Sequence, residues 1–379
     1  MVTTSNHSPD ARAVAAATRA LLAQVTAWDL DGCEVSLPDA PLDEIGWSRL
    51  VGAARQQRAE GPLASAVAAG VLPTTEAQRD QAGTAHRAAM SLTLILEREL
   101  LSLHERLRAA GVDHRVVKGA ATSHLDEADP GLRAFGDVDL LVPASSIAAA
   151  VAVVEAAGGT RRHHEPRPGY DERFSKGISF RFTRNCEIDL HRTLAPGPFG
   201  LLVDLDELLG ASERFAVGGH ELVALDRGGR FLHACYHAVL GDARPRLTSL
   251  RDLVRTAPRD AAECRSVLGR AARWHATAVV GAAIDRTVAA FGWQPPEPLA
   301  SWTRRTTRPA REVRWLHAYA GDQRLPALQA IQAITTIDGV ADRLAYARAI
   351  ALPAPSPSRT PTRERARRGV AALARLTRP

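Results

Sequence analysis

Hydrophobic residues recur every three to four positions over much of the chain, and this spacing predicts helices. The clearest stretch is 76–110, which carries a leucine face and ends at Gly111, as a glycine after a helix C-terminus usually indicates. Ala/Leu-rich patterns predict further helical structure at 11–28 and at roughly 43–70, with a break at Gly61-Pro62. Beyond about residue 200 the chain is again mostly helical, with predicted helices at 231–240, 250–256, 261–291, 313–320 and 325–350.

The pattern changes to short β-prone runs in the middle of the chain. Apolar and polar residues alternate at 178–183 and 186–191 around Arg184-Asn185, which predicts a hairpin. The other expected elements are strands at 113–118 and 137–142, a strand pair within 214–225, helices at 120–128 and 144–157, and an exposed loop or edge strand at 160–177.

We therefore predict an α+β fold, a small mixed β-sheet domain flanked by helical segments. The predicted units are a helical N-terminal segment at 1–110, a catalytic sheet domain at 111–215, a helical C-terminal domain at 216–350, and a Pro-rich linker with a basic tail at 351–379.

Three carboxylates are expected to meet on one face of the predicted sheet. Asp137 and Asp139 stand two residues apart, so on a strand they leave the same face. On the second hairpin strand, Asp189 lies on the polar face together with Glu187 and His191. Converging carboxylates repel one another unless a cation lies among them, so removing one is expected to raise the stability of the metal-free protein. The pattern favours divalent-metal and phosphate chemistry.

The net charge of +6 is misleading as a description of the whole chain. Residues 359–379 contain seven Arg and one Glu, so the rest of the chain is close to neutral. This argues against a general nucleic-acid-binding body. It also favours a small molecule over protein or RNA as the molecule on which the protein acts. Only weak contact of the 359–379 tail with RNA or anionic lipid stays open.

Lysine is nearly absent, since the 48 basic residues include only Lys118 and Lys176. Both lysines fall in the segment that carries the acidic motifs. The four cysteines are scattered and form no CxxC pair, which is typical of reduced thiols in a cytoplasmic protein. No signal peptide and no apolar run long enough to enter a membrane is visible.

These residues suit transfer of a nucleoside monophosphate from an NTP. Mg²⁺, or Mn²⁺ in its place, takes oxygen ligands, so Asp137, Asp139 and Asp189 are the predicted catalytic and metal-binding residues. Asp189 is also expected to help deprotonate the acceptor hydroxyl. Gly119 permits a tight turn where backbone N–H groups meet the triphosphate, and Lys118 and Arg133 add positive charge there.

The combined motifs resemble the bacterial nucleotidyltransferase family often labelled uncharacterised, in the polymerase-β-like superfamily. The resemblance runs from about Gly61 to Thr256 and rests on the segments Val117–Ala120, Asp129–Arg133, Asp137–Val142, Glu187–His191 and 233–253. It implies both aspartates on one strand, the third carboxylate on a neighbouring strand, and helices closing over the nucleotide. Lys118-Gly119-Ala120 stands where the superfamily usually has Gly-Gly or Gly-Ser.

Other interpretations stay open. The acceptor class could be RNA, as in toxin-like transferases, or the chain could be a non-catalytic nucleotide sensor or, least favoured, a helical interaction module. His233 and His237 have a metal-ligand spacing but no evident third ligand, so we interpret them as helix-packing residues. For Arg246, Arg251 and Asp252, structural salt bridges are favoured over contact with the nucleotide.

Overall fold

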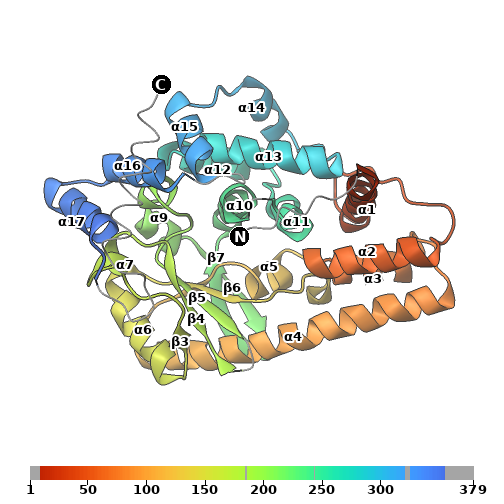
Figure 1. Cartoon of the computed structure of the whole chain (residues 1–379), viewed down its shortest axis with the longest axis horizontal. Coiled ribbons are helices and arrows are strands. Elements are labelled where there is room, and N and C mark those ends of the chain that lie inside the picture. Colours follow the sequence, from red (N-terminus) through yellow and green to blue (C-terminus); the bar gives the residue numbers. More distant parts are fainter. Residues whose placement is uncertain (1–8, 184–185, 243, 321–324, 355–379) are drawn as a thin grey trace.

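The computed structural model describes residues 9–183, 186–242, 244–320 and 325–354 and has an α+β fold (Figure 1). A seven-stranded mixed sheet, in the order β3-β4-β5-β2-β1-β7-β6, is built from the middle of the chain. Helices from both ends of the chain surround this sheet. The α+β class predicted from the sequence is confirmed.

The strands are short and follow the predicted order: β1 (Arg115–Val116), β2 (Val138–Leu141), β3 (Thr160–Arg161), β4 (Gly177–Arg181), β5 (Glu187–His191), β6 (Ser212–Val217) and β7 (His220–Leu225). β2 pairs in parallel with β5, and β1 pairs in parallel with β7, whereas the other neighbours are antiparallel. The predicted pairs β4–β5 and β6–β7 are both present. The hairpin turn Arg184-Asn185 lies outside the described residues.

Four helices precede the sheet: α1 (Pro9–Ala27), α2 (Glu44–Gln57), α3 (Glu60–Ala68) and α4 (Glu76–Ala109). The start of α4 is fixed by a capping box in which Thr75 and Gln78 satisfy each other's backbone N–H groups. Its leucine face packs on the sheet through Leu96, Leu100, Leu103 and Leu107. The predicted helical stretch over 43–70 is two helices, and the break expected at Gly61-Pro62 falls slightly earlier, because Arg58 adopts the left-handed conformation with φ +55°.

Between the strands lie α5 (Ala120–Leu125), α6 (Ile147–Ala156), α7 (Tyr170–Arg173), α8 (Pro198–Leu201), α9 (Leu205–Gly210) and the 3₁₀ turns η1 (Pro130–Leu132) and η2 (Ala144–Ser146). The polar stretch 160–177 holds the edge strand β3 and the short α7, so its prediction as a loop or edge strand is only partly right. The sequence pattern did not predict α8 and α9, which are four and six residues long.

The C-terminal part is helical: α10 (Arg227–Tyr236), the π-helical turn η4 (His237–Gly241), α11 (Leu247–Thr256), α12 (Ala261–Arg273), α13 (Thr277–Phe291), α14 (Leu299–Arg305), α15 (Ala310–Tyr319), α16 (Pro326–Thr336) and α17 (Val340–Ala351). The long helices predicted over 261–291 and 325–350 are each divided in two. The divisions fall at His275 and Gly339, both with positive φ.

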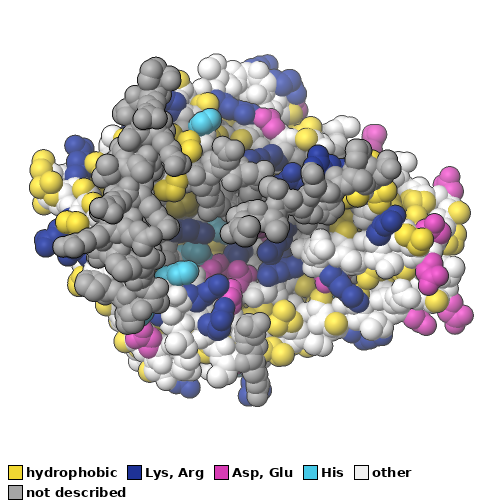
Figure 2. All heavy atoms as spheres, viewed as in Figure 1, with side chains coloured by type: hydrophobic (Ala, Val, Ile, Leu, Met, Phe, Trp, Pro, Cys, Tyr) yellow, Lys and Arg dark blue, Asp and Glu magenta, His cyan; other side chains and the backbone are white. Residues whose placement is uncertain are grey.

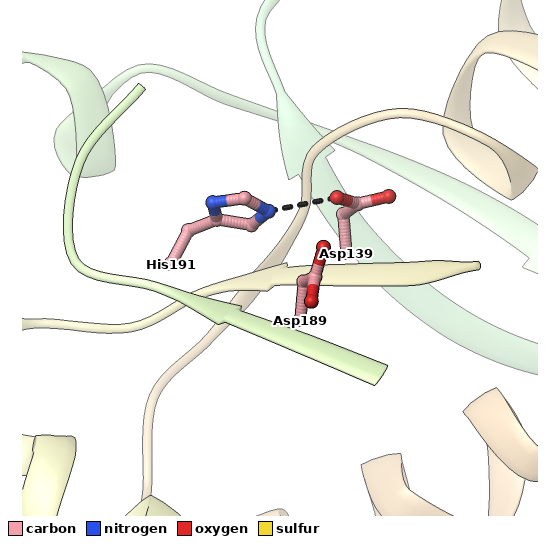
Figure 3. Close-up of side chains that lie close together, drawn as sticks. All are labelled: Asp139, Asp189 and His191. Atoms are coloured by element: carbon pink, nitrogen blue, oxygen red, sulfur yellow. Dashed lines mark hydrogen bonds and ion pairs between the residues drawn. The ribbon is translucent and has the colours of Figure 1, made fainter. Parts of the chain in front are cut away.

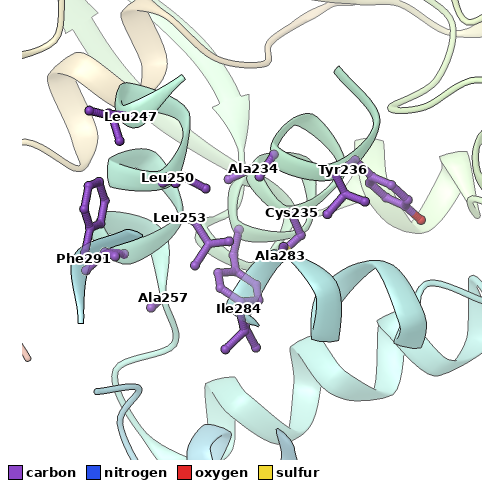
Figure 4. Packing of buried hydrophobic residues seen from close by; sticks show 14 of the residues in the cluster. Ala234, Cys235, Tyr236, Leu247, Leu250, Leu253, Ala257, Ala283, Ile284 and Phe291 are labelled. Atoms are coloured by element: carbon purple, nitrogen blue, oxygen red, sulfur yellow. The ribbon is translucent and has the colours of Figure 1, made fainter. Parts of the chain in front are cut away.

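Two hydrophobic cores divide the sheet residues by face. Alternate residues of β2 and β5, including Val138, Leu140, Ile188 and Leu190, pack with α4 and α6. The larger core joins α1–α3 to α10–α15, and Figure 4 shows Leu253 of α11 and Ile284 of α13 within it. The face of the sheet that carries the carboxylates is therefore the one turned away from α4 and α6.

The predicted unit boundary at residue 215 falls inside β6, so the sheet continues past it to Leu225. Most of the predicted linker and the whole of the predicted basic tail, 355–379, lie outside the described residues. Among the helices that the structure describes, none combines the length and apolar character that crossing a bilayer requires.

Candidate active site

Two neighbouring parallel strands bring the predicted carboxylates together. Asp139 of β2 is the register partner of Asp189 of β5, and Leu141 is the partner of His191. Because alternate residues share a face, the side chains of Asp139, Asp189 and His191 leave the sheet on the same side (Figure 3). The sequence predicts that the polar face of the strand at 186–191 lies beside Asp137 and Asp139. The observed register agrees with this prediction.

Asp139 is the most enclosed of these groups, with only 2% of its surface exposed. His191 Nε2 lies 2.7 Å from its Oδ1, and Lys118 Nζ lies 3.1 Å from its Oδ2. Burial by itself raises the pKa of a carboxyl group, but the Lys118 ammonium and His191 hold the pKa of Asp139 well below its usual range. Asp139 is therefore an ionised carboxylate in a largely dry site.

The donor set suits a divalent cation. Asp139, Asp189 and His191 each offer one ligand atom, and these atoms lie within 4.8 Å of one another. Asp139 Oδ2 is buried and accepts no hydrogen bond of good geometry from the described residues, so it has a free lone pair for a metal. Carboxylate oxygens suit Mg²⁺ and Mn²⁺, and imidazole is tolerated better by Mn²⁺.

Asp137 stands outside that group, although the sequence predicts it as a metal ligand. It directly precedes β2, and its Oδ2 accepts a hydrogen bond from Lys118 Nζ at 3.2 Å. Its Oδ1 lies 3.7 Å from Arg58 Nη1. The structure thus brings Asp137 to the same site and pairs it with two cations, while its metal-binding role stays a prediction.

Lys118 lies between the two aspartates rather than at an open phosphate site. Burial lowers the pKa of an amine, yet Asp139 and Asp137 together hold the pKa of Lys118 above its usual value. The charged ammonium therefore supplies the cation that converging carboxylates require. The sequence-based expectation of net repulsion in the metal-free site is wrong for this reason.

Gly119 makes the turn that follows Lys118. Its φ is +60°, and a Cβ there would lie 3.2 Å from the Phe135 ring, so both the backbone conformation and the close packing favour glycine. Gly119 is also the residue that caps the short α5. The predicted contact of its neighbouring N–H groups with a triphosphate stays a prediction.

Arg133 faces a carboxylate of the helical part. Its Nε and Nη2 donate to Asp252 Oδ1 and Oδ2 at 2.6 and 2.8 Å, and its Nη1 donates to the Ala134 carbonyl at 2.6 Å. The pair is buried, and Asp252 contributes to raising the pKa of Arg133 against the effect of burial. Each of the three nitrogens of the predicted phosphate-binding guanidinium thus already donates within the protein. Structural pairing of Asp252, favoured from the sequence, is confirmed.

Three buried nitrogen groups lie close enough to the site to interact with its charges. His233 and His237 lie on consecutive turns at the end of α10 and in η4, with ring centroids 6.1 Å apart. Burial is the largest cause that holds the pKa values of both imidazoles well below the usual range. His237 adds to it for His233, and the positive charges of Lys118 and Lys176 add to it for both. Burial also lowers the pKa of Lys176, although Asp139 opposes this effect. Neutral imidazoles and the second lysine therefore surround the acidic group.

Arg58 is a site residue that the sequence did not reveal. It ends α2 in a left-handed conformation and reaches over Gly136, where any Cβ would collide with the guanidinium. The available signal was Gly136 directly before Asp137, because a glycine at that position permits close approach of another group. Figure 2 shows Lys and Arg side chains gathered around acidic side chains near the centre of this face.

Comparisons with known proteins agree with this geometry at the level of the family. The model of a family described as "Uncharacterised nucleotidyltransferase" matches residues 43–292, about two thirds of the chain. No curated protein matches. One similar solved structure is an antigenic nucleotidyltransferase-like protein from Paracoccidioides brasiliensis, with 13% identity over 56% of this chain and 95% of that chain and a TM-score of 0.29. That similarity is too low to support any conclusion.

Proposed function

The chain belongs to the uncharacterised nucleotidyltransferase family, and we propose that it moves a nucleoside monophosphate from an NTP to a hydroxyl or phosphate oxygen of an acceptor. The observation that carries this proposal is the pairing of Asp139 with Asp189 in register, with His191 beside them. Kinship with the polymerase-β-like superfamily, a bacterial source and a cytoplasmic location are parts of the same proposal. None of the four cysteines, all of which the structure describes, forms a disulfide, which is consistent with that location.

In the proposed reaction the acceptor oxygen forms a bond to the α-phosphorus of the NTP. The bond from that phosphorus to the bridging oxygen of the β-phosphate breaks, and pyrophosphate leaves with the electron pair. When the acceptor is a hydroxyl, its proton passes to Asp189, which is half-buried beside Asp139. Asp139 remains ionised throughout, because Lys118 and His191 stabilise its charge.

Asp139, Asp189 and His191 would hold the divalent ion. Asp137, which the sequence predicts as a further metal ligand, lies beside this group through Lys118. A bound Mg²⁺ or Mn²⁺ would neutralise phosphate charge and orient the α-phosphate for in-line attack. Lys118 pairs with Asp137 and Asp139, and a bound ion would take over part of their charge. Lys118 and the neighbouring Gly119 would then face the donor phosphates. We assign the remaining phosphate contact to Lys176 instead of Arg133, because the Arg133 donors are occupied by Asp252 and Ala134.

Lys118→Met tests whether the lysine and a metal share the same carboxylates. Without metal, we expect the variant to lose about 1–3 kcal/mol of unfolding free energy, because buried Asp139 loses its countercharge. Added Mg²⁺ or Mn²⁺ should then raise the melting temperature of the variant more than that of the wild type, since the metal alone supplies the neutralising charge. Thermal melts across a metal titration measure both effects.

Arg98→Met is the matched control for Lys118→Met, because Arg98 is exposed on α4 and forms no ion pair within the described residues. Its metal response should equal that of the wild type. If neither metal shifts the melting temperature of the wild type or of Lys118→Met, the three-residue group does not bind these ions.

The proposed function is tested by label transfer from each of the four α-³²P-NTPs with Mg²⁺ or Mn²⁺. Cell extract is separated into RNA, protein and small-molecule fractions after the reaction. Label that appears in one fraction only with the wild type, and not with Asp139→Asn, establishes the transfer and names the acceptor class. Metal-dependent NTP binding without label in any fraction would replace this proposal with that of a nucleotide sensor.

A further inference from the structure

A groove of about 1270 Å³ lies between α1 and α2, beside the loop that leads into α11. Four arginines line it: Arg12 and Arg19 from α1, Arg49 from α2, and Arg244 from the loop. Its other described lining residues are apolar or uncharged polar side chains, with no acidic residue among them. The groove is therefore strongly basic, although the charges outside residues 359–379 nearly balance.

These arginines differ from the buried arginines elsewhere in the protein. Most of those are held by carboxylates, as in the pairs Arg133–Asp252, Arg230–Asp126 and Arg270–Asp226. Within the described part of the chain, Arg12, Arg49 and Arg244 form no ion pair. Their charges are available to an external anion.

Arg19 shows that the groove charges also act on one another. It is half-buried and donates to the Pro245 carbonyl at 3.1 Å. Burial and the positive charge of Arg244 both lower its pKa. Two like charges near each other in a partly desolvated groove are unfavourable, and an anion between them relieves the repulsion.

One lining residue of the groove is next in the chain to a residue of the carboxylate site. Gln57 lines the groove, and Gln57 Oε1 accepts a hydrogen bond from the Leu247 N–H at 3.0 Å. The next residue, Arg58, reaches Asp137 at 3.7 Å. Along α1 the lining runs from Ala11 to Leu22, about 17 Å at the rise of an α-helix. A ligand that fills the groove can thus extend over several charged groups, and Arg58 lies between the lining residue Gln57 and the carboxylate Asp137.

We propose that this groove binds the phosphate backbone of a single-stranded RNA whose 3′-terminal hydroxyl is the acceptor. This rests on the nucleotidyl transfer proposed above and names its acceptor class. The 3′ oxygen bonds to the α-phosphorus, pyrophosphate leaves with the electron pair of the broken bond, and the hydroxyl proton passes to Asp189. Repeated phosphates match several guanidinium groups that line one groove, which a small acceptor would leave mostly unpaired. The net charge outside residues 359–379 is close to zero, and for this reason the sequence favoured a small-molecule acceptor. A net charge does not show that basic residues gather in one groove.

The described lining contains no aromatic side chain on which a base could stack. Stacking platforms normally accompany recognition of single-stranded bases, whereas contacts to phosphate are independent of sequence. The groove is therefore expected to bind RNA strands of different sequence with similar affinity.

The test is fluorescence anisotropy of a 5′-labelled 12-nucleotide RNA with the full chain, without NTP or metal, from 50 to 200 mM salt. Arg49→Glu with Arg244→Glu should weaken binding at least 10-fold and reduce the slope of log K against log salt by about 1.4, or about 0.7 for each phosphate contact. Both residues are exposed, so the fold should be unaffected.

The matched control is Arg98→Glu with Arg265→Glu, which changes the net charge equally at exposed positions outside the groove. It should bind RNA as the wild type does. Equal weakening in the control, no binding by the wild type, or competition by polyglutamate as effective as that by unlabelled RNA would overturn the inference. Asp139→Asn should keep full RNA binding. Label transfer to a small molecule by a wild type that does not bind RNA would overturn this inference alone and leave the proposed function standing.

Discussion

Asp139→Asn should reduce NMP transfer by about 10³-fold or more, the scale expected when a group that stabilises transition-state charge is lost. The Asp139 side chain is the buried carboxylate of the candidate metal group, and it also pairs with Lys118 and His191. Asparagine keeps the shape of the side chain but removes the charge on which all three interactions depend. Initial rates of label transfer at saturating NTP, measured for wild type and variant, give the ratio.

The same variant should also be less stable than the wild type. The pKa of Asp139 is held below its unfolded value, so the ionised group stabilises the fold at neutral pH, and this contribution is lost as the pH falls through the acid range. Activity is therefore compared well below the melting temperature of the variant. The sequence alone predicts the opposite change in stability, because it does not place Lys118 between the carboxylates.

Asp206→Asn is the matched control, since Asp206 is exposed on α9 and forms no ion pair within the described residues. It should retain wild-type transfer. Asp189→Asn should resemble Asp139→Asn, whereas Asp137→Asn should lose less activity because Asp137 lies outside the candidate metal group. Transfer by Asp139→Asn within a few-fold of the wild type would contradict the assignment of the site.

The carboxylate strands could be predicted from the sequence because alternation in a strand determines which residues share a face. The clustering of Asp139, Asp189 and His191 follows from that rule once their two strands are neighbours, and the observed register shows that they are. The long helix α4 was equally visible, because its leucine face continues up to the glycine that follows its C-terminus, Gly111.

Other features depend on contacts between distant segments, which local patterns do not contain. Arg133 looked like a free loop cation until the fold brought Asp252 beside it, 119 residues away in the chain. Arg58 reaches the site only because a left-handed residue ends α2 and turns the chain. The basic groove arises in the same way, since its arginines come from segments that the fold places side by side.

A buried ionic network joins three parts of the chain, and Arg251 of α11 is its centre. The Arg251 guanidinium is fully buried and donates to Glu127 at 2.6 and 2.7 Å, to Asp29 Oδ2 at 2.8 Å, and to the Thr26 carbonyl at 2.8 Å. Thr26 and Asp29 belong to the N-terminal helical segment, and Glu127 follows α5 in the segment that carries the sheet. The structural salt bridge predicted for Arg251 is confirmed, and it ties both segments to the C-terminal helices.

Arg251→Met should lower the unfolding free energy by about 3–5 kcal/mol, because it leaves the buried Glu127 carboxylate without its main partner. Arg265→Met, at an exposed position of the neighbouring α12, should change it by less than about 0.5 kcal/mol. Adding Glu127→Gln to Arg251→Met should restore part of the loss, since the unpaired buried charge is then removed. Urea unfolding at pH 7 measures all three variants. A loss of unfolding free energy below about 1 kcal/mol in Arg251→Met, or no recovery in the double variant, would contradict this explanation. It would show that Arg251 does not stabilise the fold by compensating the buried charge of Glu127.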